Sequence, residues 1–448
     1  MKIIRTIQSR KTNNIFFDDI KGLKFNNSSE ILNNIIKVDS SKKYQTIKGF
    51  GGAITEAAIV ALNTLPTQKK EEAINAYFSK DGLNYNLGRL HINSCDFSRG
   101  NYCYVNDNDN TLDSFNINHD LKEIIPFVKE IQKKRNNDFY LLASPWSPPA
   151  YMKDNKNMNY GGKILEEYKQ LWANYYVKYI QEMAKHDIKI SMITIQNEPL
   201  AIQTWDSCIY SDIEERDFIK NYLGPTFKKY EIDTNIYVWD HNRGNALLKR
   251  AITILDDEEA SQYVHGLAFH WYCSEDFKSL STFHELYPDK ELLFTEGCIE
   301  YGIYKDGYLK YENGEFYAHH MINDFNNYST GFIDWNLYLD EKGGINHVNN
   351  FCEAPIMIDK ENKKIIYNAS YYYIGHFSKF VNKGARRILS TVINDNNTIE
   401  AVGFKNLNGE IVVIVLNKGW IEPVSLIVDK NQINVNLPNQ SITTFIIK

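Results

Sequence analysis

Apolar runs alternate with longer amphipathic stretches through the middle of the chain. The intervening stretches have helical spacing, as at Glu166–His186 and Glu214–Leu223. This alternation is typical of βα units around a parallel sheet. The expected strands are Gln45–Thr55, Asn84–Ser94, Asp138–Trp146, Ser191–Glu198, Ile236–His241, His265–Tyr272, Glu291–Glu296 and Gly331–Leu339. Eight such units predict an α/β fold, a (β/α)8 TIM barrel.

The pattern differs on both sides of this region. After about Asn368 the chain shows short alternating strands with polar turns, and residues before Tyr44 are also strand-like, notably Glu30–Val38. A barrel that already has eight strands cannot take up these segments. We therefore expect N-terminal strands in residues 1–44, the barrel in 45–367 and C-terminal strands in 368–448. Both termini together should form one attached β-sandwich. The clearest C-terminal strands are Thr398–Phe404, Glu410–Leu416 and Gln440–Ile447.

Composition and charge narrow the possible partners. The 448 residues are 43% hydrophobic and 24% charged, as in a globular protein with a large core. A net charge of -6 and a pI near 6.0 give no electrostatic reason to bind nucleic acid or an anionic membrane. No apolar stretch suits a signal peptide or a membrane span, so we expect a cytoplasmic protein with no obligatory membrane partner.

The cysteines give no sign of a metal site. The chain has six, scattered and without a Cys-x-x-Cys pair, and no histidines stand at ligand spacing. We expect reduced thiols, no metal and no cofactor. Buried packing is the preferred interpretation, and lining of a pocket is the alternative for cysteines beside strand ends.

Two carboxylates close predicted barrel strands. Glu198 ends Ser191–Glu198 and is followed by proline, and Glu296 ends Glu291–Glu296 and is followed by glycine. Barrel enzymes build their active sites at the carboxyl ends of the strands. A single glutamate there is more often a surface ion-pair partner. Two of them, on different strands, predict a catalytic pair suited to cleaving a glycosidic bond.

Several strand-end motifs resemble those of one enzyme family. They are Gln45-Thr-Ile-Lys-Gly-Phe-Gly-Gly-Ala-Ile-Thr55, Asn93-Ser-Cys-Asp-Phe-Ser98, Leu142-Ala-Ser-Pro-Trp-Ser-Pro-Pro149, Gln196-Asn-Glu-Pro199, His270-Trp-Tyr272, Asp334-Trp-Asn-Leu337 and Gly375-His-Phe-Ser-Lys-Phe380. The chain resembles, over nearly its whole length, the glucosylceramidase-like enzymes of glycoside hydrolase family 30. The resemblance implies a barrel with a sandwich built from both termini, and a retaining mechanism. It is weaker in the loop Ala201–Cys208.

The resemblance also implies roles for the residues that match. Glu198 is the general acid/base after strand four, and Glu296 is the nucleophile after strand seven. Arg89 and Tyr272 match residues beside the nucleophile and can keep Glu296 ionised by donating to it. Retaining carboxyls lie about 5 Å apart, and at an effective dielectric constant of about 20 ionising both costs roughly 3 kcal/mol. One of them should therefore keep its proton towards neutral pH.

The remaining site residues are expected to touch the sugar. Asn197 can bond the sugar 2-hydroxyl or, alternatively, cap its strand. Trp146 and Trp335 can stack on the sugar ring or belong to the core. His270 is expected to position rather than titrate, and Trp205 to lie beyond the cleaved bond. The full set of substrate-binding candidates is Asp96, Phe97, Trp146, Asn197, Trp205, His270, Tyr272, Trp335 and Asn350.

These observations predict a retaining exo-β-glycosidase acting on small or oligosaccharide β-glucosides. A β-xylosidase or an endo-β-1,6-glucanase remains an alternative, because one hydroxymethyl group changes binding by only about 1 to 3 kcal/mol. A metal-dependent barrel hydrolase would need a ligand cluster after the first strand, where the chain has Gly49–Glu56. A non-enzymatic sugar-binding module on an inactive barrel would have lost a catalytic carboxylate, and both are present.

Overall fold

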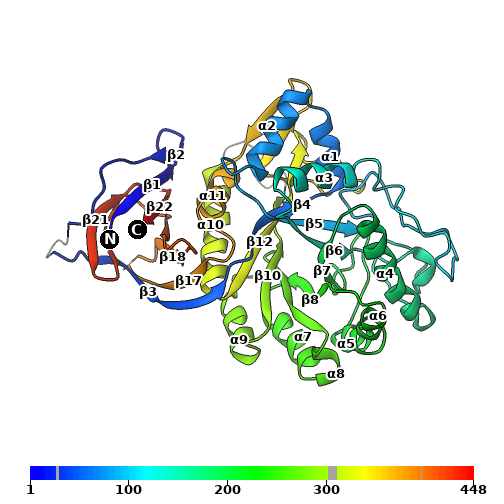
Figure 1. The fold of residues 1–448 in the computed structure, drawn as a ribbon. Helices are drawn as coiled ribbons and strands as arrows, with labels where there is room; N and C mark the ends of the chain where they lie inside the picture. Colours follow the sequence, from blue (N-terminus) through cyan, green and yellow to red (C-terminus); the bar gives the residue numbers. More distant parts are fainter. Residues whose placement is uncertain (27–29, 301–309, 395) are drawn as a thin grey trace.

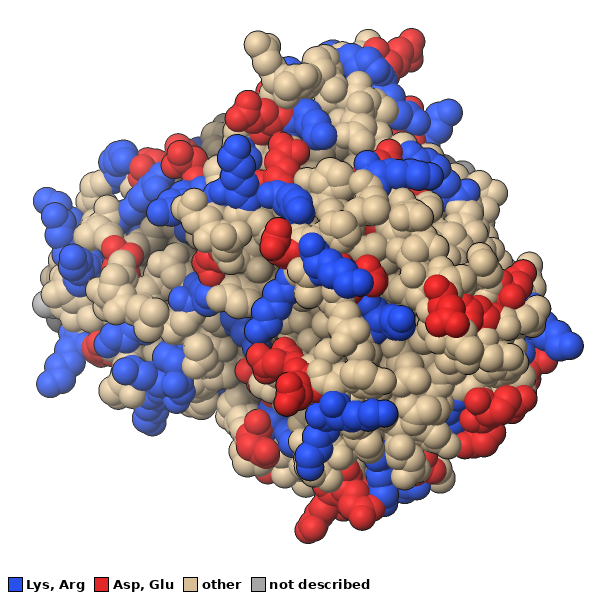
Figure 2. All heavy atoms as spheres, turned by 45° about the vertical axis from the view of Figure 1, so that its right-hand side comes forward, with Lys and Arg blue, Asp and Glu red and all other residues tan. Residues whose placement is uncertain are grey.

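The protein consists of a barrel and a β-sandwich that lie side by side (Figure 1). The computed structural model describes residues 1–26, 30–300, 310–394 and 396–448. On the face in Figure 2, acidic and basic side chains are interspersed over the surface. This face therefore lacks the single-sign stripe expected of a nucleic-acid-binding surface.

Eight parallel strands close into the barrel, as predicted. Each of the eight expected segments overlaps one of them. The first segment needs a correction, because its residues Gln45 and Thr46 belong to the sandwich strand β3 (Asn34–Thr46). The barrel strands are β4 (Gly49–Ala53), β5 (Leu87–Ile92), β6 (Tyr140–Pro145), β7 (Ile190–Thr194), β8 (Asn235–Asn242), β9 (Val264–His270), β10 (Glu291–Glu296) and β12 (Ser329–Asn336). Four of these strands, β7, β8, β9 and β12, begin one or two residues before the expected segments.

Helices surround the barrel, and two of them confirm the sequence pattern. Glu166–His186 contains α4, and Glu214–Leu223 continues α5 through one π-helical turn. Ser211 caps α5: its hydroxyl accepts from the Glu214 backbone N–H at 3.1 Å, and the Glu214 carboxylate accepts from the Ser211 N–H. The helices are α1 (Glu56–Asn63), α2 (Thr67–Phe78), α3 (Ile124–Lys134), α4 (Lys169–Lys185), α5 (Asp212–Phe218), α6 (Gly224–Lys229), α7 (Asn245–Leu255), α8 (Glu258–Ser261), α9 (Lys278–Leu286), α10 (Tyr311–Asn326) and α11 (Ala369–Ser378).

The sandwich joins both ends of the chain in one hydrogen-bonded sheet. Its strand order is β2-β1-β22-β19-β18-β17-β3-β20-β21. The N-terminal strands β1 and β2 therefore lie at one edge of the sheet, and the N-terminal strand β3 lies between the C-terminal strands β17 and β20. The predicted sandwich from both termini is therefore confirmed. Besides β3, its strands are β1 (Ile3–Arg10), β2 (Ile15–Asp19), β17 (Arg386–Ile393), β18 (Ile399–Lys405), β19 (Ile411–Asn417), β20 (Glu422–Val428), β21 (Asn431–Leu437) and β22 (Ser441–Ile447).

Helices α10 and α11 lie between the two parts (Figure 1). Phe325 of α10 packs edge-on against Phe404 of β18, with ring centres 5.5 Å apart. In α11, His376 bonds the Thr444 hydroxyl of β22 at 2.8 Å. Apolar and polar contacts therefore both fix the sandwich to the barrel. Among the described residues, no helix combines the length and apolar character needed to cross a bilayer.

Short strands pair with one another in the loops between and after the last barrel strands. One two-stranded ribbon pairs β11 (Ile299–Glu300) with β14 (Cys352–Glu353). A second small sheet contains β13 (Tyr338–Asp340), β15 (Ile356–Asp359) and β16 (Lys364–Tyr367). The first ribbon directly follows Glu296, so it joins the end of β10 to the loop after β12.

Substitution of Gly51 tests how closely β4 and β5 approach each other. A Cβ atom at this position would lie 2.0 Å from the backbone oxygen of Leu87, which cannot rotate away. We expect Gly51→Ala to lower the free energy of unfolding by about 1 to 3 kcal/mol through overpacking. Gly100 has no atom within 4 Å of such a Cβ and is the control. Equal melting temperatures for Gly51→Ala and Gly100→Ala would contradict the tight packing.

Candidate active site

A cavity of about 570 Å³ opens at the carboxyl ends of the barrel strands. It is lined by residues from the ends of several strands and from the loops that follow them. The structure thus brings most of the predicted site residues together. The predicted residues that line it are Asp96, Trp146, Asn197, Glu198, Trp205, Tyr272, Glu296, Trp335 and Asn350.

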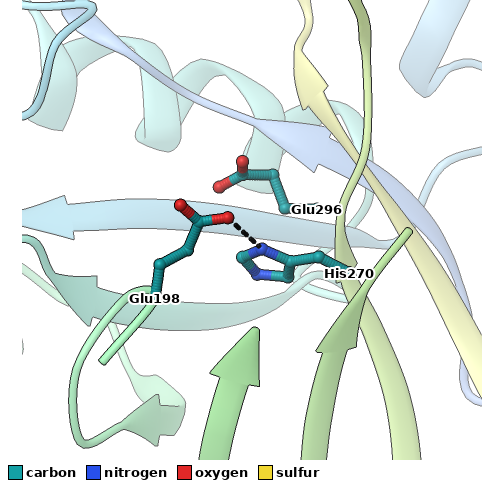
Figure 3. Close-up of side chains that lie close together, drawn as sticks. All are labelled: Glu198, His270 and Glu296. Atoms are coloured by element: carbon teal, nitrogen blue, oxygen red, sulfur yellow. Dashed lines mark hydrogen bonds and ion pairs between the residues drawn. The ribbon is translucent and has the colours of Figure 1, made fainter. Parts of the chain in front are cut away.

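The two predicted catalytic glutamates face each other in this cavity (Figure 3). Carboxylate oxygens of Glu198 and Glu296 lie within 4.8 Å of one another. Glu296 is the last residue of β10. Glu198 follows β7 and has a left-handed backbone, with φ of 46°, and its N–H donates to the Asp240 carbonyl at 2.9 Å. This unusual backbone conformation directs Glu198 across the barrel mouth.

Glu296 receives two strong hydrogen bonds. Arg89 Nη1 donates to Oε2 at 2.6 Å, and the Tyr272 hydroxyl donates to Oε1 at 2.9 Å. Arg89 lies in β5 and is fully buried, whereas Tyr272 follows β9. Each oxygen of Glu296 therefore has a donor, and one of the donors carries a permanent charge.

Glu198 has a different partner, His270. The His270 Nδ1 lies 3.2 Å from Glu198 Oε1, the contact drawn in Figure 3. His270 is fully buried at the end of β9 and does not line the cavity, so it acts on Glu198 from beneath. A second imidazole, His241, lies farther away, with Nε2 3.9 Å from the same oxygen.

Asp240, which the sequence did not single out, connects these two groups. This fully buried residue of β8 accepts from Arg89 Nη2 at 2.8 Å and lies 3.0 Å from His270 Nε2. The hydroxyls of Thr194 and Thr295 each donate to it at 2.6 Å. Asp240 therefore binds both Arg89, which donates to Glu296, and His270, which contacts Glu198.

The charges of this network shift its pKa values. Burial alone would raise the pKa of Asp240, but the Arg89 charge and the His270 hydrogen bond hold it well below its usual range. Burial lowers the pKa of His270, yet the fields of Glu296 and Asp240 outweigh burial and raise it to about 9. At neutral pH His270 is consequently a cation that donates from both nitrogens.

The same protonation state bears on metal binding. Glu198, His270 and Glu296 are, among the described residues, a group whose atoms lie close enough to share an ion. A metal ligand needs a free lone pair on the imidazole, and a protonated His270 has none. Arg89 beside Glu296 adds a further positive charge. The donor set therefore does not fit a metal ion.

The two glutamates titrate as a pair. Burial raises the pKa of Glu296. Burial would raise that of Glu198 too, but the His270 hydrogen bond and the His241 charge lower it overall. With Arg89 and His270 as cations, three ionised carboxylates including Asp240 leave one excess negative charge. A single proton shared by Glu198 and Glu296 removes that excess.

The aromatic residues take different places. Trp146 and Trp335 line the cavity and stack on each other, with ring centres 5.3 Å apart, so each has one face already covered. The Arg89 guanidinium lies 4.8 Å from the centre of the Trp146 ring. Phe97, in contrast, is fully buried and packs edge-on against Trp335. Phe97 does not line the cavity, so its predicted place among the substrate-binding residues is not supported.

Asp96 forms a polar group at the cavity wall. Its Oδ2 accepts from the side-chain amides of Asn350 at 3.0 Å and Asn346 at 3.2 Å. Burial raises the pKa of Asp96 to about 8, although these hydrogen bonds oppose the shift. At neutral pH Asp96 can consequently donate as well as accept a hydrogen bond.

Sequence reasoning missed several cavity residues. His241 and Asn242 stand directly after Asp240 in Val-Trp-Asp-His-Asn, a polar end of a predicted barrel strand that could have been a signal. Cys298 and Cys352 also line the cavity, which supports the less favoured of the two interpretations of the cysteines. Nothing in their spacing, 54 residues apart, predicted that they would meet.

Asp240→Asn tests the central role of this carboxylate. Losing the charge leaves Arg89 and His270 without their buried partner, so we expect a loss of about 3 to 5 kcal/mol in unfolding free energy. His270 has a raised folded pKa, and its stabilising effect is complete below about 6.5 and lost as pH rises through about 9. Denaturant unfolding from pH 6 to 9.5 should show this decline in the wild type and a weaker one in the variant.

Asp340→Asn is the matched control. Asp340 is also buried and paired with a cation, Lys360 at 2.6 Å, and its pKa is lowered, so it does not titrate in this range. The control should lose stability and keep the wild-type pH slope. An Asp240→Asn slope equal to that of the wild type would refute the coupling to His270.

Comparison with known proteins agrees with this geometry. The family model described as "Glycosyl hydrolase family 30 TIM-barrel domain" matches residues 47–381, and the "Glycosyl hydrolase family 30 beta sandwich domain" matches 384–445. The chain is 34% identical to the lysosomal acid glucosylceramidase of Mus musculus, over 86% of this chain and 77% of that protein. It is 29% identical to an endo-1,6-beta-D-glucanase of Neurospora crassa, over 84% and 80% respectively.

Solved structures give the same relationship. SrfJ from Salmonella typhimurium superposes with a TM-score of 0.95 at 36% identity, covering 100% of both chains. An endo-β1,6-glucanase superposes with a TM-score of 0.88 at 28% identity, covering 99% of both. Family models that match nearly the whole chain, together with relatives above 30% identity, show that this protein belongs to glycoside hydrolase family 30.

Proposed function

We propose that this protein is a retaining exo-β-glycosidase that hydrolyses β-glucosides by double displacement. The observation that carries the proposal is the separation of the two carboxylates, whose oxygens lie within 4.8 Å. Retaining glycosidases place their carboxyls about 5 to 5.5 Å apart, whereas inverting enzymes need about 6.5 to 9.5 Å to admit a water. The spacing therefore supports attack by a carboxylate on the sugar.

Glu296 is the nucleophile in this proposal. Arg89 and Tyr272 donate to both of its oxygens, and the Arg89 charge opposes the rise in pKa that burial causes. Attack on the anomeric carbon forms a glycosyl ester and breaks the bond to the leaving oxygen. Tyr272 and Arg89 remain in place to orient the ester oxygens.

Glu198 supplies and removes the proton. It has a more exposed side chain than Glu296, 14% against 8%, so an arriving leaving group displaces more water from it. Loss of water raises a carboxyl pKa, and the shared proton then resides on Glu198 beside the leaving oxygen. After the leaving group departs, ionised Glu198 accepts a proton from water, which hydrolyses the ester.

The surrounding residues bind the sugar. Arg89 Nη2 donates to Asn197 Oδ1 at 2.9 Å, which fixes the side-chain amide and leaves its N–H donors for the sugar 2-hydroxyl. Asp96, held by Asn346 and Asn350, is assigned to hydroxyls of the same ring. Trp146 and Trp335 supply apolar surface for its C–H groups.

Comparison with relatives supports glucose as the sugar. The Mus musculus relative is named as a glucosylceramidase, so a β-glucoside with a lipid leaving group is one candidate substrate. A second candidate function is endo-β-1,6-glucanase, the activity for which relatives at 28 to 29% identity are named. Both share the same carboxylate chemistry and differ in what lies beyond the cleaved bond.

A substrate panel separates these functions. It should contain aryl β-glucoside, β-xyloside, β-galactoside and β-fucoside, β-1,6-glucan, and glucosylceramide with and without detergent or anionic lipid. We expect the highest kcat/KM on the β-glucoside and release of glucose with retained β configuration. Oligosaccharides from β-1,6-glucan would establish the endo function, and an inverted product would refute the retaining mechanism.

Substitution of each glutamate distinguishes the two roles. Glu296→Ala should abolish turnover, by about 10⁴-fold or more, because no nucleophile remains. Glu198→Ala should still react with good leaving groups, which need no acid, and added azide should restore turnover by attacking the ester. The product is then a β-glycosyl azide, identified by NMR. Azide rescue of Glu296→Ala with the same β product would reverse the assignment.

Substitution of Trp205 tests which part of the cavity binds the leaving group. Trp205 lines the cavity from the loop after β7. Stacking on a second sugar or an aryl group is worth roughly 1 kcal/mol, so Trp205→Ala should lower kcat/KM for a disaccharide by about fivefold. A methyl glycoside should be nearly unaffected. An equal loss on both substrates would give Trp205 a structural role.

A further inference from the structure

We propose that Cys298 and Cys352 form a redox-sensitive modification site, at which a hydroperoxide converts two cavity thiols into a disulfide that inhibits the enzyme. Cys298 precedes β12 in the sequence and Cys352 follows it, and their Sγ atoms lie 3.2 Å apart. Both are free thiols in this structure. The inhibition part of the proposal rests on the proposed function, and the cross-link itself does not.

The backbone already brings the two cysteines together. Cys298 directly precedes β11 and Cys352 begins β14, and these two strands pair antiparallel. The thiols pack with Trp335 in one small apolar cluster. Because the Sγ atoms lie 3.2 Å apart and a disulfide bond is about 2 Å long, a bond between them requires only a local shift of the two segments.

Small reagents can reach the pair through the active-site cavity. Cys298 and Cys352 are 7% and 3% exposed, and what remains exposed faces the cavity that holds Glu296. Cys95 and Cys208 are fully buried and line no part of this cavity. Hydrogen peroxide is small enough to enter a space that accepts a sugar ring.

The oxidation balances with a hydroperoxide as the sole co-reactant. Ionised Cys298 attacks one peroxide oxygen, so that an S–O bond forms, the O–O bond breaks and an alcohol or water leaves. The sulfur of Cys352 then displaces the hydroxyl of this sulfenic acid, forming the S–S bond and a second molecule of water. Two thiols lose two electrons and two protons, and the peroxide is reduced.

The order of attack follows from the surroundings of each sulfur. Contact with Cys298 and burial both raise the pKa of Cys352 well above its usual range. Contact with Cys352 lowers the pKa of Cys298, but burial and the charges of Glu296 and Asp334 together raise it above its usual value. Cys298 is therefore the first of the two to ionise, and the reaction is slower than that of an exposed thiol.

The pair is connected to the nucleophile. Cys298 is two residues beyond Glu296, and its Sγ lies 3.5 Å from the Tyr272 hydroxyl that donates to Glu296. The intervening Gly297 packs tightly, since a Cβ there would lie 2.4 Å from Trp271. Formation of the disulfide moves Cys298 towards β14. Because Gly297 is tightly packed, Glu296 and Tyr272 are displaced as well.

The test treats the purified full-length protein with hydrogen peroxide and then with dithiothreitol. We expect the mass to fall by two hydrogen atoms, a peptide linking Cys298 to Cys352, and at least about tenfold loss of glycosidase activity that dithiothreitol reverses. Cys298→Ser should keep its own starting activity during the same treatment. Cys352→Ser should stop at a sulfenic acid on Cys298, which dimedone traps.

Cys103→Ser is the matched control, because Cys103 is a partly buried thiol outside the cavity. It should respond as the wild type does. The proposal is overturned if no linked peptide forms at a peroxide dose that oxidises the exposed Cys273, or if the linked protein keeps full activity. Absence of activity in the untreated protein would count against the proposed function, while the linked peptide still tests the thiol pair.

Discussion

The candidate site depends on one buried carboxylate, Asp240. A charge without solvent is unstable unless it is paired and fully hydrogen-bonded, and four donors surround this one. Two of them, Arg89 and His270, are cations that Asp240 compensates. Each cation then faces one of the two glutamates at the cavity floor.

This arrangement explains how two similar glutamates acquire different properties. Glu296 is bonded by a guanidinium and a phenol, whereas Glu198 is bonded by an imidazole and lies nearer the solvent. The barrel makes the contrast possible, because His270 and Glu296 are paired residues at the ends of β9 and β10, and Asp240 lies near the end of the neighbouring β8, where the register shifts. The different surroundings of the two glutamates are therefore built into strand order rather than into the glutamates themselves.

The sequence predicted the scaffold better than the contacts within it. A barrel strand is buried on both sides and needs a continuous apolar run, which is why Glu291–Glu296 was predicted with its observed bounds. Asp96 and Phe97 are adjacent, yet only Asp96 lines the cavity, because the loop conformation decides which side chain faces it. Asp240 acts through Arg89 and His270 on other strands, and a single sequence carries no direct signal of such contacts.

The charge network and the substrate-recognition surface are separate parts of this protein. Asp240, Arg89 and His270 are buried beneath the glutamates and do not line the cavity, whereas Trp205 and Gln203 line it from the loop after Glu198. Substitution in that loop can change which leaving group fits without disturbing any buried charge. In the proposed mechanism the strands therefore set the acid-base chemistry, and the loops that they support set the choice of glycoside.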